Sequence, residues 1–284
     1  MSDDTPRNHD GWDPFPSSDR DRRQAAEKSG GTPQSRSPTY RLAFDDPDFM
    51  TSEETRGIRL QLELMKPERA FLDAGILSTV VLFGGARIPA PGQDAWAARN
   101  ETQRKNLQAN AKYYDEARRF AQIASQHSAT SSGGKEFVIV TGGGPGVMEA
   151  GNRGAEDVGA PSIALNIVLP HEQEPNPHAT PELCFNFHYF AIRKMHFLLR
   201  AKAMAIFPGG FGTMDELFEA LTLIQTKRMQ KIPVILFGEA FWKRVINFEA
   251  LAEEGTIAPD DLKLLTFAET AEDGWQAIRT FYGF

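Results

Sequence analysis

Two glycine-rich turns are the residues of this sequence best suited to holding an anion. They read Gly-Gly-Gly-Pro-Gly over residues 142–146 and Pro-Gly-Gly-Phe-Gly-Thr over residues 208–213. Each turn follows a strand-like run and precedes a helical pattern, so main-chain N–H groups and the positive end of a helix dipole can converge on a phosphate. Glycine also permits close approach of the ligand. The alternative is that these glycines only form tight turns, which the whole fold class needs.

A third turn, Gly84-Gly85-Ala86-Arg87, also follows a strand-like run. With the hydroxyl donor of Thr213, the three turns favour a shared ligand site over turn geometry alone. Arg87 is a candidate ligand contact, and its alternative is an ordinary surface residue.

Glu216 and Arg193 are the charged residues most suited to a chemical role. Glu216 follows Thr213 by three positions, in the first turn of the helix predicted there, where its carboxylate can face the same crevice as the glycine N–H groups. The alternative is that Glu216 only complements the helix dipole. Arg193 lies on a helical segment that leads into a strand, where a guanidinium can bind phosphate or stabilise developing charge. Its alternative is a solvated helix face.

Several other kinds of site do not fit the sequence. A Gly-x-Gly-x-x-Gly match that begins at Gly142 would need glycine at Val147, and neither glycine turn continues as a Walker sequence. The histidines lack metal-ligand spacing, and Cys184 is the single cysteine, so we expect no metal site. NAD, ATP-type P-loop and zinc chemistry are therefore disfavoured.

Five short runs of β-branched and aliphatic residues predict the strands that position these turns. They span residues 79–83, 137–141, 162–168, 204–207 and 233–237. Helical patterns lie over residues 102–127, 147–158, 189–202 and 214–226. Strands alternating with helices of this length indicate right-handed crossovers. The predicted fold class is α/β, a Rossmann-like doubly wound and mostly parallel sheet with helices on both faces.

The chain is expected to contain one such domain. Residues 1–48 are rich in Asp, Arg, Ser, Pro and Gly and predict a disordered N-terminal tail. Residues 49–284 are predicted to form a single α/β nucleotide-binding catalytic domain with helical additions. Its first helix should begin near Ser52, with Pro67 as an interruption or a boundary.

Charge and composition narrow the partners and the location. The formal net charge is −7, and this acidic balance argues against nucleic-acid coating or a membrane-surface role. No apolar run approaches the roughly 20 residues of a membrane span. One cysteine permits no intrachain disulfide, so we expect a cytoplasmic protein.

The motifs resemble those of the Lonely Guy (LOG) family, often labelled lysine-decarboxylase-like. Its hallmark Pro-Gly-Gly-x-Gly-Thr-x-x-Glu matches residues 208–216 in full. Its earlier element Gly-Gly-Gly-x-x-Gly-x-Met resembles residues 142–148, with the later glycine one position early, and an Arg-Lys pair corresponds to Arg193 and Lys194. The resemblance covers about residues 80–237. The flanking segments are more like the longer, type II members, which form assemblies larger than dimers.

The resemblance implies a phosphoribohydrolase that cleaves the N-glycosidic bond of adenine-type nucleoside 5′-monophosphates, AMP or cytokinin riboside monophosphates, to free base and ribose 5-phosphate. It implies Glu216 and Arg193 as catalytic residues, without settling whether Arg193 acts on the leaving base or positions the nucleotide. The substrate-binding residues that it implies, together with the third turn, are Gly85, Arg87, Gly143, Gly144, Lys194, Gly209, Gly210, Gly212 and Thr213.

No cofactor is expected, because nothing in the sequence supports the pyridoxal-phosphate chemistry of the lysine-decarboxylase label. The expected partners are the nucleoside monophosphate and further copies of the chain, at least a dimer and up to a hexamer. The alternative function is a non-catalytic sensor that uses the same phosphate cradle.

Overall fold

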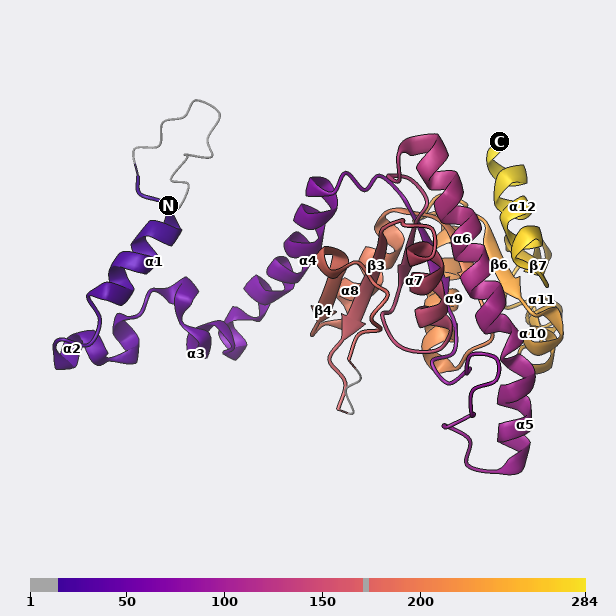
Figure 1. Cartoon of the computed structure of the whole chain (residues 1–284), viewed down its shortest axis with the longest axis horizontal. Coiled ribbons are helices and arrows are strands. Elements are labelled where there is room, and N and C mark those ends of the chain that lie inside the picture. Colours follow the sequence, from indigo (N-terminus) through magenta and orange to yellow (C-terminus); the bar gives the residue numbers. More distant parts are fainter. Residues whose placement is uncertain (1–14, 171–173) are drawn as a thin grey trace. The chain divides into compact units, whose positions relative to one another are not determined.

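The computed structural model describes residues 15–170 and 174–284, and its centre is a seven-stranded parallel sheet (Figure 1). The strands lie in the order β4-β3-β2-β1-β5-β6-β7. They span β1 Thr79–Phe83, β2 Val138–Thr141, β3 Ser162–Ile167, β4 Cys184–Phe187, β5 Ala201–Ile206, β6 Val234–Phe237 and β7 Leu265–Ala268. The chain builds outward from β1 to β4 on one side, then returns to place β5 on the other side of β1. This arrangement confirms the predicted doubly wound fold.

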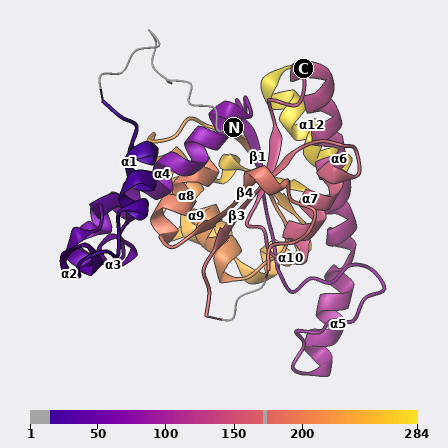
Figure 2. The same ribbon diagram turned by 60° about the vertical axis from the view of Figure 1, so that its left-hand side comes forward.

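Helices cover both faces of the sheet. The helices among the described residues, including those of the first part of the chain that are not assigned to the sheet, are α1 Ser18–Glu27, α2 Pro33–Arg36, α3 Pro47–Met50, α4 Arg56–Asp73, α5 Glu101–Asn110, α6 Lys112–Ser132, α7 Val147–Glu156, α8 Phe190–Leu199, α9 Phe211–Gln225, α10 Glu239–Val245, α11 Phe248–Glu253 and α12 Ala271–Tyr282. Figure 2 shows α6, α7 and α12 together on one side of the sheet, with α8 and α9 on the other side.

The residues of β1 alternate between two hydrophobic cores. Val80 and Leu82 pack with residues of α6, α7 and α12. Val81 and Phe83 pack with residues of α8 to α11 and with Phe71 of α4. Every residue of β1 is buried because both faces of the strand are covered. The apolar run without alternation is the sequence signal of this double burial.

All five predicted strands are present, and two edge strands were missed. The strand predicted over residues 204–207 begins earlier, at Ala201, because α8 ends at Leu199 and not at residue 202. The missed strands, β4 and β7, are the two edges of the sheet and have only four residues each. Short edge strands are half-exposed and give little periodic signal.

Three further predicted helices differ more clearly from the structure. The helix over residues 102–127 is two helices, α5 and α6, which meet at Ala111. Helix α9 begins at Phe211, three residues before the predicted start. Helix α4 continues through Pro67, so this proline is neither an interruption nor a boundary.

The chain divides between Leu62 and Glu63 into two compact parts, and α4 crosses the division. In the first part, α1 to α3 are short helices, and no residue between positions 15 and 48 is buried. Residues 1–14 of the predicted tail lie outside the described residues. The disordered tail and its boundary at residue 48 stay predictions.

Candidate active site

The three glycine turns meet at the carboxyl-terminal edge of the sheet, around β1. The turn after β1 connects the other two: the amide of Gly85 donates to the Pro208 carbonyl at 2.9 Å, and the Gly85 carbonyl accepts from the Val147 amide at 3.4 Å. Because β1 lies between β2 and β5, the chain connections diverge here. Such a switch point leaves a crevice in which α/β proteins bind ligands.

A cavity of about 760 Å³ occupies this crevice. It contains most of the predicted site residues, namely Gly85, Arg87, Arg193, Gly209, Gly210, Gly212, Thr213 and Glu216. These residues come from the turns after β1 and β5 and from helices α8 and α9. The structure therefore brings together groups that lie more than a hundred residues apart in the sequence.

Three predicted site residues do not line the cavity. The Gly143 amide donates to Thr141 Oγ1 at 3.0 Å, and the Gly143 and Gly144 carbonyls both accept from Asn176 Nδ2. Lys194 forms ion pairs with Asp215 and Glu219, at 3.0 and 2.9 Å. Gly142, which was not predicted as a contact, lines the cavity in place of Gly143 and Gly144.

The amino terminus of α9 forms one wall of the cavity. Its N-cap is Gly210, and no side chain caps this end. The first amides of a helix lack intrahelical acceptors, and the helix dipole is positive there. Thr213 lies so close to Gly209 that a Cβ at position 209 would clash with its hydroxyl. The turn is therefore tight, and the first backbone amides of α9 lie close to the Thr213 hydroxyl.

Glu216 lies in the second turn of α9 and is only 5% exposed. The earlier start of the helix corrects its predicted place in the first turn, so complementing the helix dipole does not account for its position. Burial raises the pKa of Glu216 to about 7, although the cations of Arg193 and Lys194 oppose this shift. Its Oε2 is buried without a hydrogen-bond partner in the described part of the chain. A carboxylate held in this way is typical of catalytic sites.

Arg193 reaches the cavity from α8. Its Nε donates to the Leu165 carbonyl at 2.7 Å, and its guanidinium lies 5.1 Å from the centre of the Phe197 ring. Burial lowers the pKa of Arg193, and the charge of Glu216 opposes this effect. A Cβ on Gly142 would lie 2.8 Å from Arg193 Nη2. Glycine at position 142 therefore leaves the space that the guanidinium occupies.

Part of the remaining wall comes from residues that the sequence did not indicate. Leu107 and Asn110 of α5 and Phe241 of α10 line the cavity. No motif marks them, because they come together only through the packing of separate helices. Arg87, which was predicted, is exposed at the cavity, and no ion pair is recorded for it in residues 15–170 and 174–284.

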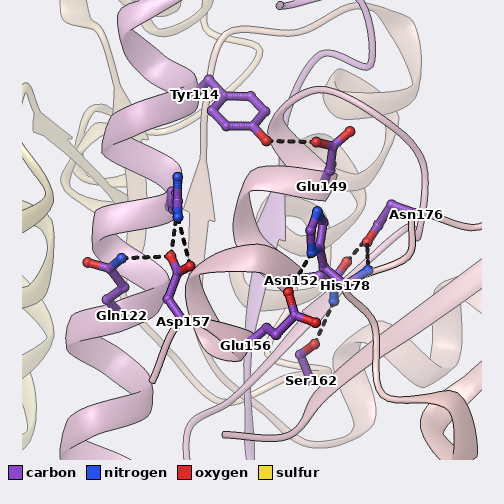
Figure 3. A network of polar contacts seen from close by, with 10 residues as sticks. Tyr114, Gln122, Glu149, Asn152, Glu156, Asp157, Ser162, Asn176 and His178 are labelled. Carbon is purple, nitrogen blue, oxygen red and sulfur yellow. Dashed lines mark hydrogen bonds and ion pairs between the residues drawn. The ribbon is translucent and has the colours of Figure 1, made fainter. Parts of the chain in front are cut away.

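A buried polar network contacts the first glycine turn, and Figure 3 shows its members Asn152, Ser162 and Asn176. Asn152 Oδ1 accepts from Thr141 Oγ1 at 2.6 Å and from Asn176 Nδ2 at 2.9 Å, and Asn152 Nδ2 donates to Ser162 Oγ at 2.9 Å. The Asn176 amide also donates to the Gly143 carbonyl at 2.8 Å. Thus Asn176 fixes the carbonyls of the turn and Asn152 holds the Asn176 side chain, and sequence reasoning missed both.

The residues that the structure describes contain no helix long and apolar enough to cross a bilayer. They also contain no group of three or more His, Cys, Asp or Glu side chains arranged to hold a metal ion.

The fold and this cavity define a Rossmann-like α/β protein with an uncapped helix amino terminus at its switch point. Residues 148–278 match the family model described as "Possible lysine decarboxylase". The chain is also 30% identical over 159 residues to the cytokinin riboside 5′-monophosphate phosphoribohydrolase LOG of Oryza sativa subsp. japonica, which covers 53% of this chain and 64% of the relative. Residues 148–278 are thus similar to this lysine-decarboxylase-like, LOG family.

Other similarities are shorter or more distant. The cytokinin riboside 5′-monophosphate phosphoribohydrolase LOG3 of Arabidopsis thaliana is 29% identical over 82 residues, which is 28% of this chain and 38% of the relative. The alignments thus span less than two thirds of these curated relatives. Among solved structures, the molybdenum cofactor binding protein of Rippkaea orientalis is 17% identical, with a TM-score of 0.44 over 72% of this chain and 97% of that one.

Proposed function

We propose that the chain hydrolyses the N-glycosidic bond of adenine-type nucleoside 5′-monophosphates, AMP or cytokinin riboside monophosphates, and releases the base and ribose 5-phosphate. The observation that supports this most is the buried Glu216 in the same cavity as Arg193 and the uncapped start of α9. The relatives from Oryza sativa and Arabidopsis thaliana are named cytokinin riboside 5′-monophosphate phosphoribohydrolases, which agrees with this proposal.

The proposed binding mode places the 5′-phosphate at the start of α9. The amides of the turn that contains Gly209, Gly210 and Gly212 and the hydroxyl of Thr213 would donate to it, and the exposed Arg87 adds a cation. Binding energy from the phosphate, which is remote from the reacting bond, then orients the ribose. Gly143 and Gly144 support this cradle indirectly, because the cavity wall is formed by Gly142.

In the proposed reaction, the bond between the anomeric carbon and the base nitrogen breaks as positive charge develops on the ribose. The Glu216 carboxylate stabilises this charge and accepts a proton from the water whose oxygen bonds to the anomeric carbon. The departing base takes up one proton, so that overall one hydrogen of the water stays on the new ribose hydroxyl and the other ends on the base nitrogen. Arg193, held by the Leu165 carbonyl, places its cation beside the nucleotide and favours the ionised form of Glu216.

The test is incubation of the purified protein with AMP and with isopentenyladenosine monophosphate. We expect free base and ribose 5-phosphate from at least one of them, and much slower release from adenosine, which lacks the phosphate. Saturable binding without product would replace hydrolysis with the sensor function. Absence of both binding and product would contradict the proposal altogether.

We also propose that the protein is a cytoplasmic homo-oligomer, at least a dimer and up to a hexamer. Supporting the assembly, large apolar side chains are exposed on α8 and α9: Phe190, Met195, Leu199, Phe211 and Phe218. Phe211, at the start of α9, is 93% exposed. Large exposed apolar groups of this kind are typical of association surfaces. Light scattering should give a mass of two or more chains, and a monomer at all concentrations would contradict the assembly.

A further inference from the structure

Helix α4 contains a proline in its interior, and this proline frees one backbone carbonyl. Pro67 has no N–H, so the carbonyl of Glu63, four residues earlier, lacks the usual helical donor. His196 Nε2 lies 3.1 Å from that carbonyl oxygen and can donate to it. Both Pro67 and His196 are buried. A backbone group of α4 therefore contacts α8 at the turn that follows Arg193.

The side chain of the same Glu63 contacts the other end of α8. Its carboxylate accepts from the amides of His188 and Tyr189, at 2.7 and 3.1 Å. Tyr189 is the N-cap of α8, and its own side chain does not cap the helix. A carboxylate at a helix amino terminus satisfies donors that the helix leaves open and complements its dipole. Glu63 thus caps α8 from a different helix.

Arg193 lies between these two contacts. Its amide donates to the Tyr189 carbonyl at 3.2 Å, so the turn that Glu63 caps is the turn that ends at Arg193. Helix α8 has ten residues, and His196 follows Arg193 by less than one turn. One residue of α4 therefore holds α8 on both sides of its cavity-lining arginine.

A second acidic residue of α4 holds the end of α8. Both carboxylate oxygens of Glu68 accept from the Arg200 guanidinium, at 2.5 and 2.8 Å. That guanidinium also lies 5.2 Å from the centre of the Phe71 ring. This paired geometry fixes the C-terminal side of α8, which leaves Glu63 as the residue that determines the orientation of its first turn.

We propose that Glu63 is a positioning residue for Arg193: by capping α8 at His188 and Tyr189 and by accepting from His196, it holds the guanidinium at the reacting nucleotide. This inference rests on the proposed function, in which Arg193 acts on the substrate. A displacement of about 1 Å of a group that acts in the transition state can reduce turnover about a hundredfold.

The kinetic test compares Glu63→Ala and Glu63→Gln with the control Arg69→Ala. Arg69 lies on the same helix and forms an exposed ion pair with Asp73, away from α8. We expect Glu63→Ala to lower kcat about tenfold to a hundredfold with KM within about threefold, because the phosphate site on α9 is untouched. Glu63→Gln, which keeps an acceptor oxygen, should recover part of kcat. Unchanged kcat in Glu63→Ala would overturn the proposal.

A second measurement needs no turnover. The Arg193 Nε–H donates to the Leu165 carbonyl, so its NMR signal, assigned through its loss in Arg193→Lys, should exchange slowly with solvent. We expect faster exchange in Glu63→Ala and Glu63→Gln, and no change in Arg69→Ala. If the wild type released no base, the proposed function would fail, while this signal would still decide whether Glu63 positions Arg193. If the Arg193 Nε–H exchanged at the same rate in wild type and in all variants, the positioning role would be overturned. If Glu63→Ala does not fold, the comparison of Glu63→Gln with wild type decides in the same way.

Discussion

At the scale of single residues, the buried carboxylate of Glu216 is the group on which the proposed chemistry depends. Its burial has two opposite consequences. It makes the ionised form costly in the folded protein, and it removes competing water from the place where positive charge would develop. The first consequence predicts an effect on stability, and the second predicts an effect on turnover.

The first prediction concerns turnover. Replacement Glu216→Gln keeps the shape of the side chain but removes its charge, so base release from AMP should fall by roughly 100-fold or more. The matched control is Glu219→Gln, one turn on in α9, whose carboxylate pairs with Lys194. This control should retain most of the activity. Full turnover in Glu216→Gln would remove the assigned role of the carboxylate.

The second prediction concerns stability and pH. The pKa of Glu216 is raised from 4.5 to about 7, so the folded state holds this proton more tightly than the unfolded state does. The contribution of Glu216 to the free energy of unfolding is therefore fully present below about pH 4.5 and is lost as the pH rises through about 7. The shift corresponds to an upper value of roughly 3 kcal/mol.

Urea unfolding of wild type and Glu216→Gln at pH 5 and pH 8 measures this difference. The variant should gain free energy of unfolding relative to wild type at pH 8, and little at pH 5. An equal difference at both values would show that the pKa of Glu216 is not raised in the folded state.

At the scale of elements, the sequence predicts those parts whose signal is local. The run Thr79–Phe83 is apolar throughout because the strand is covered on both faces, and this pattern is visible without a structure. The edge strand β4 has a residue pattern of alternating burial over only four residues, too short to stand out. The continuation of α4 through Pro67 depends on His196, a donor from a distant helix, and no local pattern contains it.

The same distinction applies to the site. The hallmark over residues 208–216 gave the α9 turn and Glu216, since they are consecutive in the chain. Asn176, by contrast, contacts the first glycine turn from the connection between β3 and β4, through long-range bonds. An asparagine in a loop has no pattern that indicates such a role.

The third prediction tests the contact between Asn176 and the first glycine turn. Asn176→Ala removes the side-chain donor to the carbonyls of Gly143 and Gly144, which should cost about 1–3 kcal/mol of unfolding free energy and lower kcat/KM. The control is His178→Ala. His178 is two residues from Asn176 in the sequence, and its replacement removes a contact with the Glu156 carboxylate at the surface. Chemical unfolding should show little change for this control, at most about 1 kcal/mol. Equal losses in the two variants would contradict a specific role for Asn176.

At the scale of the whole molecule, we expect the sheet domain to fold and to act without residues 1–48. No residue between positions 15 and 48 is buried, so their contribution to folding free energy should be small. The fourth prediction is that a chain without residues 1–48 keeps its Tm within about 2 °C and its base-release activity. Thermal unfolding and product chromatography measure these two quantities. A large fall in Tm would show that the tail stabilises the domain.

The central position of β1 also affects the order in which the strands of the sheet can pair during synthesis. Thr79 pairs with Ala201, and Phe83 pairs with Ile206, so one side of β1 has no partner until the ribosome has synthesised much of the chain. Until then, a nascent chain presents the unpaired backbone edge of β1, a strand with apolar side chains, to solvent and to other nascent chains. The strand that organises the cavity is thus also the point at which interrupted synthesis would lead to aggregation.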